Sequence, residues 1–334
     1  MMPKMLITDR LHASIAEEQK ICDYYGFELV DHYCNNEDEI IEQGHDVVGL
    51  LVSYAKITKR IIKSLPNLRV IVKYGVGVDN IDIPAATDEG VYVANIPDYC
   101  LQEVASFSLS LILMGMKQIK YFNVNMENNV WIAQPKEKIL LRPSSVTFGL
   151  VGFGRIARTL AEYVQPLFKE ILFYDPYFAG LTPSRCQRVN SVKELFSTCQ
   201  IISIHVPLTE TSRNMIGSEI LEQAHGLILV NTARAAVINF EALSEALDHG
   251  NVAFYGADSY WSEPPDFSDR FIKDFISRDD VVITPHCAWC SLESEQEVRR
   301  KAASTIVQVV NGNLPENILN PHLPNHRSWS GAVV

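Results

Sequence analysis

The sequence predicts an α/β protein with two Rossmann-like lobes, each a parallel β-sheet with helices on both faces. Three observations favour this fold class. Short apolar strands alternate with helical segments over residues 1–100, the same alternation returns over residues 144–286, and the second series begins with a glycine-rich turn. The chain has 334 residues, and at roughly 150 residues per domain this length also predicts about two domains.

The first lobe is predicted from short runs of Val, Ile and Leu that are separated by polar helical segments. Gly26 and Pro66 are expected to end two of these helices. Parallel strands joined by short helices predict a flavodoxin-like sheet. The strands are expected at residues 4–9, 27–32, 46–53, 68–75 and 90–95, and the helices at residues 10–26, 35–44 and 58–66.

The second lobe is predicted to begin with a long helix near residues 101–119. A strand at 144–154 follows and runs into the glycine-rich turn, and helical segments such as 240–250 separate most of the later strands. These later strands are expected at residues 171–175, 201–207, 227–233, 253–260 and 281–286.

The C-terminal segment is predicted to return to the first lobe. Its helix, residues 294–312, should have Gly312 as its C-cap. Because no strand is predicted after residue 290, this segment needs another sheet to pack against. The expected domains are therefore residues 1–100 with 289–334, which are discontinuous in sequence, and residues 101–288.

Composition excludes several classes of partner. The net charge is −11, which disfavours nucleic acid because phosphate binding needs clustered Lys and Arg. The longest charge-free apolar stretch, residues 104–116, is shorter than the roughly 18 residues that span a membrane, and no signal peptide is visible. Seven scattered cysteines are typical of reduced cytosolic thiols. We expect a cytoplasmic protein that binds neither nucleic acid nor membranes.

A glycine turn lies directly after an apolar strand and opens a helix. It contains Gly152, Gly154 and Ala157 in the spacing G-x-G-x-x-A. Gly152 would allow the tight turn, and Gly154 would let a pyrophosphate approach the backbone. The amides of Arg155 and Ile156 would then face the phosphate. The alternative is a turn that serves only helix–strand packing.

Asp175 stands at the end of the next predicted strand. A carboxylate there can accept hydrogen bonds from both ribose hydroxyls of a dinucleotide, and it repels a 2′-phosphate. The sequence therefore predicts NAD rather than NADP as the cofactor.

Three later strands each end in a residue capable of chemistry: Arg234, Glu263 and His286. Ligands of parallel sheets bind at the carboxyl ends of the strands. Reduction of a 2-keto acid needs a cation that holds the carboxylate, a proton donor for the forming alkoxide and a carboxylate that stabilises the imidazolium. Each residue could instead be a salt bridge or turn residue, but their joint occurrence after a dinucleotide turn favours catalysis.

The sequence resembles the D-isomer-specific 2-hydroxyacid dehydrogenases over essentially the whole chain. The spacings from Arg234 to Glu263 and from Glu263 to His286 are similar to those of the family. Matching stretches include KYGVGVDNIDIPAA (73–86), VANIPDYCLQEVA (93–105), HVPLTETSRNMI (205–216), LVNTARAAVI (229–238) and TPHCAW (284–289).

The resemblance implies an NAD-dependent oxidoreductase that transfers a hydride between NADH and a 2-keto acid or D-2-hydroxy acid. It implies His286 as the acid/base, Glu263 as its partner and Arg234 as the substrate anchor. The discontinuous domain would bind the substrate, and residues 101–288 would bind NAD. The family is homodimeric, with the helix near 101–119 and the segment after it forming much of the interface.

The resemblance also implies further contacts with substrate and cofactor. The backbone amides of Val76 and Gly77 would bind the substrate carboxylate, and Asp258 would meet the nicotinamide carboxamide. The remaining cofactor contacts would come from His205, Val206, Pro207, Thr211, Thr232 and Ala233.

Within the family, LFYDPY, IVKYGVGVDNIDI and HCAWCS are most similar to the C-terminal-binding-protein branch. In that branch a tryptophan three residues after the histidine lines the substrate pocket, and Trp289 holds this position. Lys73 holds the place of a basic residue near the substrate carboxylate. Tyr54 and Tyr99 stand in loops that are expected to set selectivity for the substrate side chain.

Two other functions stay open. An NAD(H)-sensing, corepressor-like interaction protein would use cofactor-driven dimerisation with weak dehydrogenase activity, but the complete Arg–Glu–His set favours an enzyme. A phosphoglycerate-type dehydrogenase should need added cations for the phosphate, and Lys73 is the one candidate that the sequence offers.

The stretch PHCAWCS (285–291) also contains a Cys-x-x-Cys pair, Cys287 and Cys290. Zinc would need two further ligands, and no second cysteine pair occurs, so we expect no metal site. A redox dithiol stays open because the segment enters a helix, and helix N-termini acidify thiols. We expect the two cysteines to be packing residues.

Overall fold

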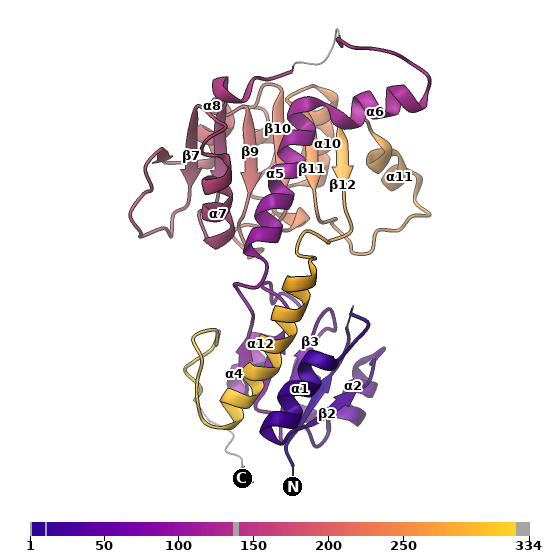
Figure 1. Ribbon diagram of the computed structural model, residues 1–334, viewed down its shortest axis with the longest axis vertical. Coiled ribbons are helices and arrows are strands. Elements are labelled where there is room, and N and C mark those ends of the chain that lie inside the picture. Colours follow the sequence, from indigo (N-terminus) through magenta and orange to yellow (C-terminus); the bar gives the residue numbers. More distant parts are fainter. Residues whose placement is uncertain (1, 11, 136–139, 325–334) are drawn as a thin grey trace. The chain divides into compact units, whose positions relative to one another are not determined.

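The computed structural model describes residues 2–10, 12–135 and 140–324 (Figure 1). The chain forms two compact units, one from residues 1–100 and 291–334 and the other from residues 101–290. Each unit contains one sheet in which every pair of neighbouring strands is parallel. The predicted α/β class with two parallel-sheet lobes is confirmed.

The first unit is built on a five-stranded sheet with the order β2-β1-β3-β4-β5, which is the flavodoxin-like order. Its strands are short and almost entirely apolar, as expected for a parallel sheet that is covered on both faces. The elements are β1 Lys4–Ile7, α1 Ala16–Tyr25, β2 Glu28–Asp31, α2 Glu37–Gly44, β3 Gly49–Val52, α3 Lys59–Ser64, β4 Val70–Lys73, α4 Ile83–Asp88, β5 Tyr92–Ala94 and α12 Leu292–Val310.

Helices cover both faces of this first sheet. α2, α3 and α4 contribute to an apolar cluster with β3 and β4, whereas α12 contacts α1, β3 and β4. α12 begins at a capping box in which the Ser291 hydroxyl accepts from the Ser294 amide and Ser294 caps in return. The helix α12 therefore packs against the first sheet.

Two helix ends in this unit differ from the sequence prediction. α1 begins at Ala16 rather than near residue 10, because the Arg10 guanidinium binds the Asp31 carboxylate and the His12 carbonyl and holds this segment outside the helix. The C-cap of α12 is Asn311, and Gly312 follows it with a left-handed φ of +82°. Glycine is favoured there because left-handed backbone costs it no steric strain.

The second unit is built on a seven-stranded sheet with the order β12-β11-β10-β9-β6-β7-β8. The strand order reverses between β6 and β9, and dinucleotides bind at such a switch point. The elements are α5 Leu101–Lys117, α6 Ile119–Glu127, η1 Pro143–Ser145, β6 Thr147–Val151, α7 Arg155–Val164, β7 Glu170–Tyr174, β8 Cys186–Arg188, α8 Val192–Thr198, β9 Ile201–Ile204, α9 Ser218–Leu221, β10 Leu227–Asn231, η2 Ala235–Val237, α10 Phe240–Asp248, β11 Val252–Ala257, α11 Arg270–Ser277 and β12 Val281–Ile283.

Two apolar clusters lie on opposite faces of the second sheet. One joins the strands to α5 and α7, which Figure 1 shows together on the near face, and the other joins them to α8, α9, α10 and α11. The single helix expected near 101–119 is in fact two, because Gln118 adopts a left-handed φ of +50° between α5 and α6. No helix within the described ranges is both long and apolar enough to cross a membrane.

A buried ionic cluster joins α1, α12 and Tyr74, which directly follows β4, in the first unit. The Glu18 side chain is fully buried and accepts hydrogen bonds from Arg299 Nη2 at 2.7 Å and from the Tyr74 hydroxyl at 2.8 Å. His12 Nε2 lies 3.3 Å from Glu18 Oε1. Burial alone would raise the pKa of Glu18, but these hydrogen-bonding partners lower it to about 2.

Replacing Glu18 by Gln should change both stability and its pH dependence. The folded pKa lies below the ordinary value of 4.5, so the carboxylate contributes stability above about pH 4.5 that is lost as the pH falls towards 2. Glu18→Gln removes the nearer of the two counter-ions of buried Arg299 and leaves Glu295 at 3.4 Å, and we expect a loss of about 3 kcal/mol near pH 7 and a shallower decline in acid. Urea unfolding followed by circular dichroism at several pH values measures both.

The matched control for this experiment is Glu17→Gln in the same helix. Glu17 pairs with Lys20 at the surface, so its loss should cost less than about 1 kcal/mol. Equal stability and equal acid dependence for the two variants would contradict the role assigned to the buried carboxylate.

Candidate active site

The glycine turn lies between β6 and α7, and its geometry requires glycine at position 152. Gly152 has a φ of +88°, and a Cβ there would lie 2.6 Å from the carbonyl oxygen of His205. Gly154 is the N-cap of α7, and no atom lies within 4 Å of the position of a Cβ. The first-turn amides, including those of Arg155 and Ile156, need partners from outside the helix. The turn therefore has the free amides and the open space that a pyrophosphate group requires.

Asp175 follows β7 and is held against this turn by backbone amides. Its Oδ2 accepts from the amide of Phe153, inside the glycine motif, at 2.8 Å, and its Oδ1 accepts from the amide of Tyr177 at 2.8 Å. The half-buried carboxylate is thus fixed at the rim of the turn. This placement fits a ribose-binding acid next to a pyrophosphate.

The loop after β9 faces the same turn across the switch point. The His205 amide donates to the Val151 carbonyl at 2.8 Å, and its ring Nε2 lies 2.8 Å from the Ser203 hydroxyl. Burial lowers the pKa of His205 to about 4, so the ring is neutral at pH 7. A neutral ring beside the turn adds no charge to the predicted cofactor site.

The rest of this loop is ordered by one hydroxyl. Ser212 Oγ donates to the Pro207 carbonyl at 2.6 Å and accepts from the Thr209 amide at 2.8 Å. Val206 is half-buried, whereas Pro207 and Thr211 are exposed. All three remain available to a ligand bound along the loop.

The turn after β10 carries Arg234 and is clamped by a buried asparagine. Asn231 Oδ1 accepts from the Ala233 amide at 3.0 Å, and Asn231 Nδ2 donates to the Arg234 carbonyl at 3.0 Å. The Thr232 hydroxyl lies 2.8 Å from the hydroxyl of Ser108 on α5. The main chain of this turn is therefore rigid, while Arg234 keeps a half-buried guanidinium.

Glu263 and His286 form the hydrogen-bonded pair that the sequence predicted. His286 Nδ1 lies 2.8 Å from Glu263 Oε2, and the other oxygen, Oε1, accepts from the Tyr260 amide at 3.1 Å. Burial alone would raise the pKa of Glu263, but the hydrogen bond and charge of His286, the Tyr260 amide and the nearby Arg234 charge together lower it. His286 and Arg234 thus both stabilise the charge of Glu263.

The loop that carries His286 is held by Asp258. This carboxylate is almost fully buried, and it accepts from Thr284 Oγ1 at 2.6 Å and from the amides of Cys287 at 2.9 Å and Ala288 at 2.7 Å. His286 adopts a left-handed φ of +56° within this loop. Such a backbone costs a non-glycine residue about 1–3 kcal/mol and persists only where neighbouring bonds over-determine it. The Asp258 hydrogen bonds supply that restraint.

Trp289 and the cysteines complete this loop. The Trp289 indole Nε1 donates to the His286 carbonyl at 3.0 Å. Both cysteines are free thiols, Cys290 exposed and Cys287 half-buried, and burial and the Asp258 carboxylate raise the pKa of Cys287. A raised pKa disfavours a reactive thiolate. Among the described residues, no group of three or more His, Cys, Asp or Glu side chains could hold a metal ion.

The predicted substrate residues of the first unit share a network around Lys73. Its Nζ donates to the carbonyl of Ser53 and to Asn80 Oδ1, and it lies 5.4 Å from the ring centroid of Tyr54. Asp9 accepts from the amides of residues 53–55, at 3.0 Å for Ser53. The loop that carries Tyr54 is thus held by Asp9 on one side and by Lys73 on the other. The Lys73 ammonium already has hydrogen-bond acceptors inside its own unit.

The loop after β4 exposes the backbone that the sequence assigned to a substrate carboxylate. Val76 is exposed and Gly77 half-buried. The Asn95 side chain donates to the Val76 carbonyl at 2.7 Å and so holds this peptide group in place. Tyr99 is buried, and its hydroxyl approaches Gly75.

Sequence reasoning missed several residues that shape these sites. Asn231 and Ser108 orient the Arg234 turn and Thr232, while Asp9 and Asn80 hold the Tyr54 loop. These are single polar residues within apolar or loop segments, so no spacing marks them. One signal was present for Asn231, since a fully buried position in the strand at 227–233 admits an amide only where the amide has partners.

Comparison with known proteins gives consistent matches. A family model described as the NAD binding domain of the D-isomer specific 2-hydroxyacid dehydrogenases matches residues 109–288. A D-3-phosphoglycerate dehydrogenase of Methanocaldococcus jannaschii is 32% identical over 98% of this chain, which spans only 61% of that relative's length. A hydroxypyruvate reductase of Thermotoga maritima is 34% identical over 78% of this chain and 84% of its own length.

A solved structure shows the same fold over both units. The D-lactate dehydrogenase of Aquifex aeolicus, crystallised with NAD and lactic acid, has a TM-score of 0.83 to this chain. The match covers 96% of this chain and 99% of that one, at 23% sequence identity. At this identity the likeness shows the fold, and the roles of individual residues rest on the geometry above.

Replacing Asp258 by Asn should loosen the loop that carries His286. Asparagine has one acceptor oxygen, so at least one of the three donors loses its partner and an NH₂ group faces a backbone amide. We expect a loss of about 2–4 kcal/mol in the stability of the second unit, measured by urea unfolding. Asp279→Asn, at an exposed position, should change stability by less than about 0.5 kcal/mol; the same small change at Asp258 would show that the loop does not depend on the carboxylate.

Proposed function

The chain belongs to the D-isomer-specific 2-hydroxyacid dehydrogenases, and from this premise we propose that it transfers a hydride between NADH and the C2 atom of a 2-keto acid or D-2-hydroxy acid. The observation that carries the proposal is the Glu263–His286 pair beside the charge of Arg234. These three groups match the three needs of the reaction, which are a proton donor, its stabilising carboxylate and a carboxylate anchor.

In this mechanism each residue of the second unit has a separate role. NAD supplies hydride transfer when bound, with its pyrophosphate at the Gly152–Gly154 turn and its adenine ribose at Asp175. Glu263 stays ionised because its pKa is lowered, so it stabilises a protonated His286. His286 then donates its Nε2 proton to the oxygen at C2 in the reductive direction, which neutral pH favours, and takes it back in the oxidative one.

We propose that residues of the first unit also bind the substrate. The backbone amides of Val76 and Gly77 would bind its carboxylate. Tyr54 and Trp289 would contact the substrate's side chain. The nicotinamide side of the cofactor would meet Thr232 and, at its carboxamide, Asp258. Because the Asp258 oxygens already accept three hydrogen bonds, its larger contribution is to hold the loop.

A phosphoglycerate-type reaction is a second candidate, because one relative is named a D-3-phosphoglycerate dehydrogenase. It ranks lower, since the Lys73 ammonium is already shared between Ser53 and Asn80. The relative named a hydroxypyruvate reductase favours a small 2-keto acid. The C-terminal-binding-protein branch and the corepressor-like role stay predictions, as do the cytoplasmic location and the absence of nucleic-acid and membrane partners.

We also propose that the protein is a homodimer formed through α6 and the segment after it. Apolar side chains are exposed there, among them Met126 (54%), Val130 (41%) and Trp131 (83%). Exposed apolar side chains that gather in one segment are typical of interaction surfaces. A second copy that covers it in the same way would form a two-fold interface.

Replacing His286 by Ala should remove the proton donor and leave cofactor binding intact. We expect kcat for 2-keto acid reduction to fall by about 10²–10⁴-fold, while the Kd for NADH changes less than about threefold. Steady-state assays with a panel of 2-keto acids and a fluorescence titration with NADH measure the two quantities. His249→Ala, at an exposed position in the same unit, is the control, and unchanged turnover in His286→Ala would overturn the mechanism.

Replacing Asp175 by Ser should weaken the discrimination between NADH and NADPH. Serine still accepts a backbone hydrogen bond, but it no longer repels a 2′-phosphate or accepts from both ribose hydroxyls. We expect the NADH/NADPH ratio of kcat/KM to fall by about 10- to 100-fold, or roughly 1.4–2.8 kcal/mol. Glu162→Gln, exposed on α7, should leave the ratio unchanged; a wild-type preference for NADPH would contradict the assignment of Asp175.

A further inference from the structure

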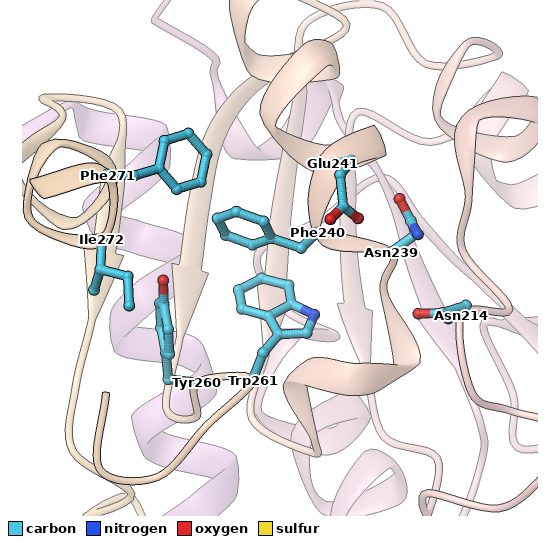
Figure 2. Close-up of a pocket in the computed structure, with 8 residues that line it drawn as sticks. All are labelled: Asn214, Asn239, Phe240, Glu241, Tyr260, Trp261, Phe271 and Ile272. Atoms are coloured by element: carbon cyan, nitrogen blue, oxygen red, sulfur yellow. The ribbon is translucent and has the colours of Figure 1, made fainter. Parts of the chain in front are cut away.

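A cavity of about 360 Å³ opens within the second unit, apart from the three catalytic groups (Figure 2). Eight residues line it, and Arg234, Glu263 and His286 are not among them. Its size lies within the range of small-molecule sites, roughly 300–1,000 Å³. The walls come from α10, α11 and the loop after β11, together with Asn214.

One end of the cavity is aromatic. The ring of Phe240 lies 4.7 Å from that of Trp261 and 5.5 Å from that of Phe271, at interplanar angles of 74° and 76°. The Tyr260 ring stands at 89° to Trp261, 5.4 Å away. Figure 2 shows these four rings and Ile272 around a common space. Steeply angled neighbouring rings present faces and edges on several sides of a ligand.

The other end of the cavity is polar and acidic. Asn214, Asn239 and Glu241 line it, and Glu241 alone among the eight lining residues carries a formal charge. Burial and the charge of Asp269 raise the pKa of Tyr260, so the tyrosine hydroxyl is neutral at pH 7. The formal charge among the lining residues is therefore that of Glu241, which is negative.

We propose that this cavity binds a small organic cation with an apolar body, such as an arylalkylammonium. The aromatic faces attract a cation through their quadrupoles, and the Glu241 carboxylate accepts a charge-assisted hydrogen bond from it. The Asn214 carboxamide provides a further acceptor, whereas Asn239 Oδ1 already accepts from the Ala242 amide as the N-cap of α10. An organic anion would meet Glu241 and the negative ring faces, so the site discriminates by charge.

Local structure explains only part of this arrangement. Glu241 lies in the first turn of α10, where a carboxylate stabilises the helix dipole. The dipole does not account for Phe271, which is 57% exposed at the mouth of the cavity. The exposed ring of Phe271 and the Glu241 carboxylate both line the cavity, so a ligand with an apolar part and a charged part can contact both.

The cavity touches the catalytic pair through one hydrogen bond. Tyr260 lines the cavity with its ring, and its amide donates to Glu263 Oε1 at 3.1 Å. An occupant therefore contacts a residue that orients the proposed acid/base partner. Binding at this site can be measured without turnover, so its failure and the failure of the dehydrogenase mechanism are separate results.

The test is isothermal titration calorimetry on the full chain saturated with NADH. The probes are 2-phenylethylammonium, its neutral analogue 2-phenylethanol and the anion 3-phenylpropanoate. We expect the ammonium to bind, the alcohol to bind at least fivefold more weakly and the anion not to bind. Glu241→Gln should weaken ammonium binding by about five- to thirtyfold, and Phe271→Leu, which keeps an apolar side chain without a ring, should weaken it several-fold.

Glu245→Gln is the matched control, because Glu245 is exposed on the same helix and does not line the cavity. Its affinity for the ammonium should equal that of the wild type. The proposal is overturned if the ammonium does not bind, if alcohol and ammonium bind equally, or if Glu241→Gln binds like the control. It is also overturned if saturating oxamate, an inert 2-keto acid analogue, abolishes binding, since the probe would then occupy the catalytic site.

Discussion

The buried Asp258 carboxylate is the constraint on which the catalytic geometry depends. His286 occupies a left-handed backbone conformation that a histidine adopts only at a cost. Asp258 accepts from the residues on both sides of it, Thr284 before and Cys287 and Ala288 after. These bonds hold the backbone of the His286 loop, and Glu263 holds the imidazole ring. A ring held at both its backbone and its Nδ1 keeps Nε2 in one direction, which proton transfer requires.

Much of the fold could be predicted from the sequence, because its signals are local and repeated. Apolar runs of strand length, helix stops at Gly26 and Pro66 and the context of Gly152 predicted parallel sheets with a dinucleotide turn. The misplaced boundaries arise from tertiary contacts. Arg10 binds Asp31, more than twenty residues away along the chain, and so delays α1. Gln118 turns left-handed between two helices whose apolar pattern runs on without a break.

The candidate site also contains residues that the sequence could predict and residues that it could not. Arg234, Glu263 and His286 follow strands and carry chemistry that suits strand ends, so spacing and residue type predicted them. The residues that orient them could not be predicted, because a lone Asn231 or Ser108 resembles any other polar residue until the fold provides its partner. The Cys-x-x-Cys pair misleads for the opposite reason. Its spacing is suggestive, but Asp258 and burial raise the pKa of Cys287, which opposes the acidification that a helix N-terminus would give.

The two oxygens of Glu263 connect the catalytic groups to the rest of the second unit. Oε2 meets His286, and Oε1 meets the amide of Tyr260. A carboxylate bound at one oxygen alone could rotate and release the imidazole, whereas one bound at both keeps its plane. The cost of this arrangement is that the orientation of Glu263 depends on the turn from Tyr260 to Glu263. The side chain of Tyr260 packs among the rings of the aromatic cavity. The packing of that cavity and the orientation of Glu263 therefore both depend on the position of Tyr260.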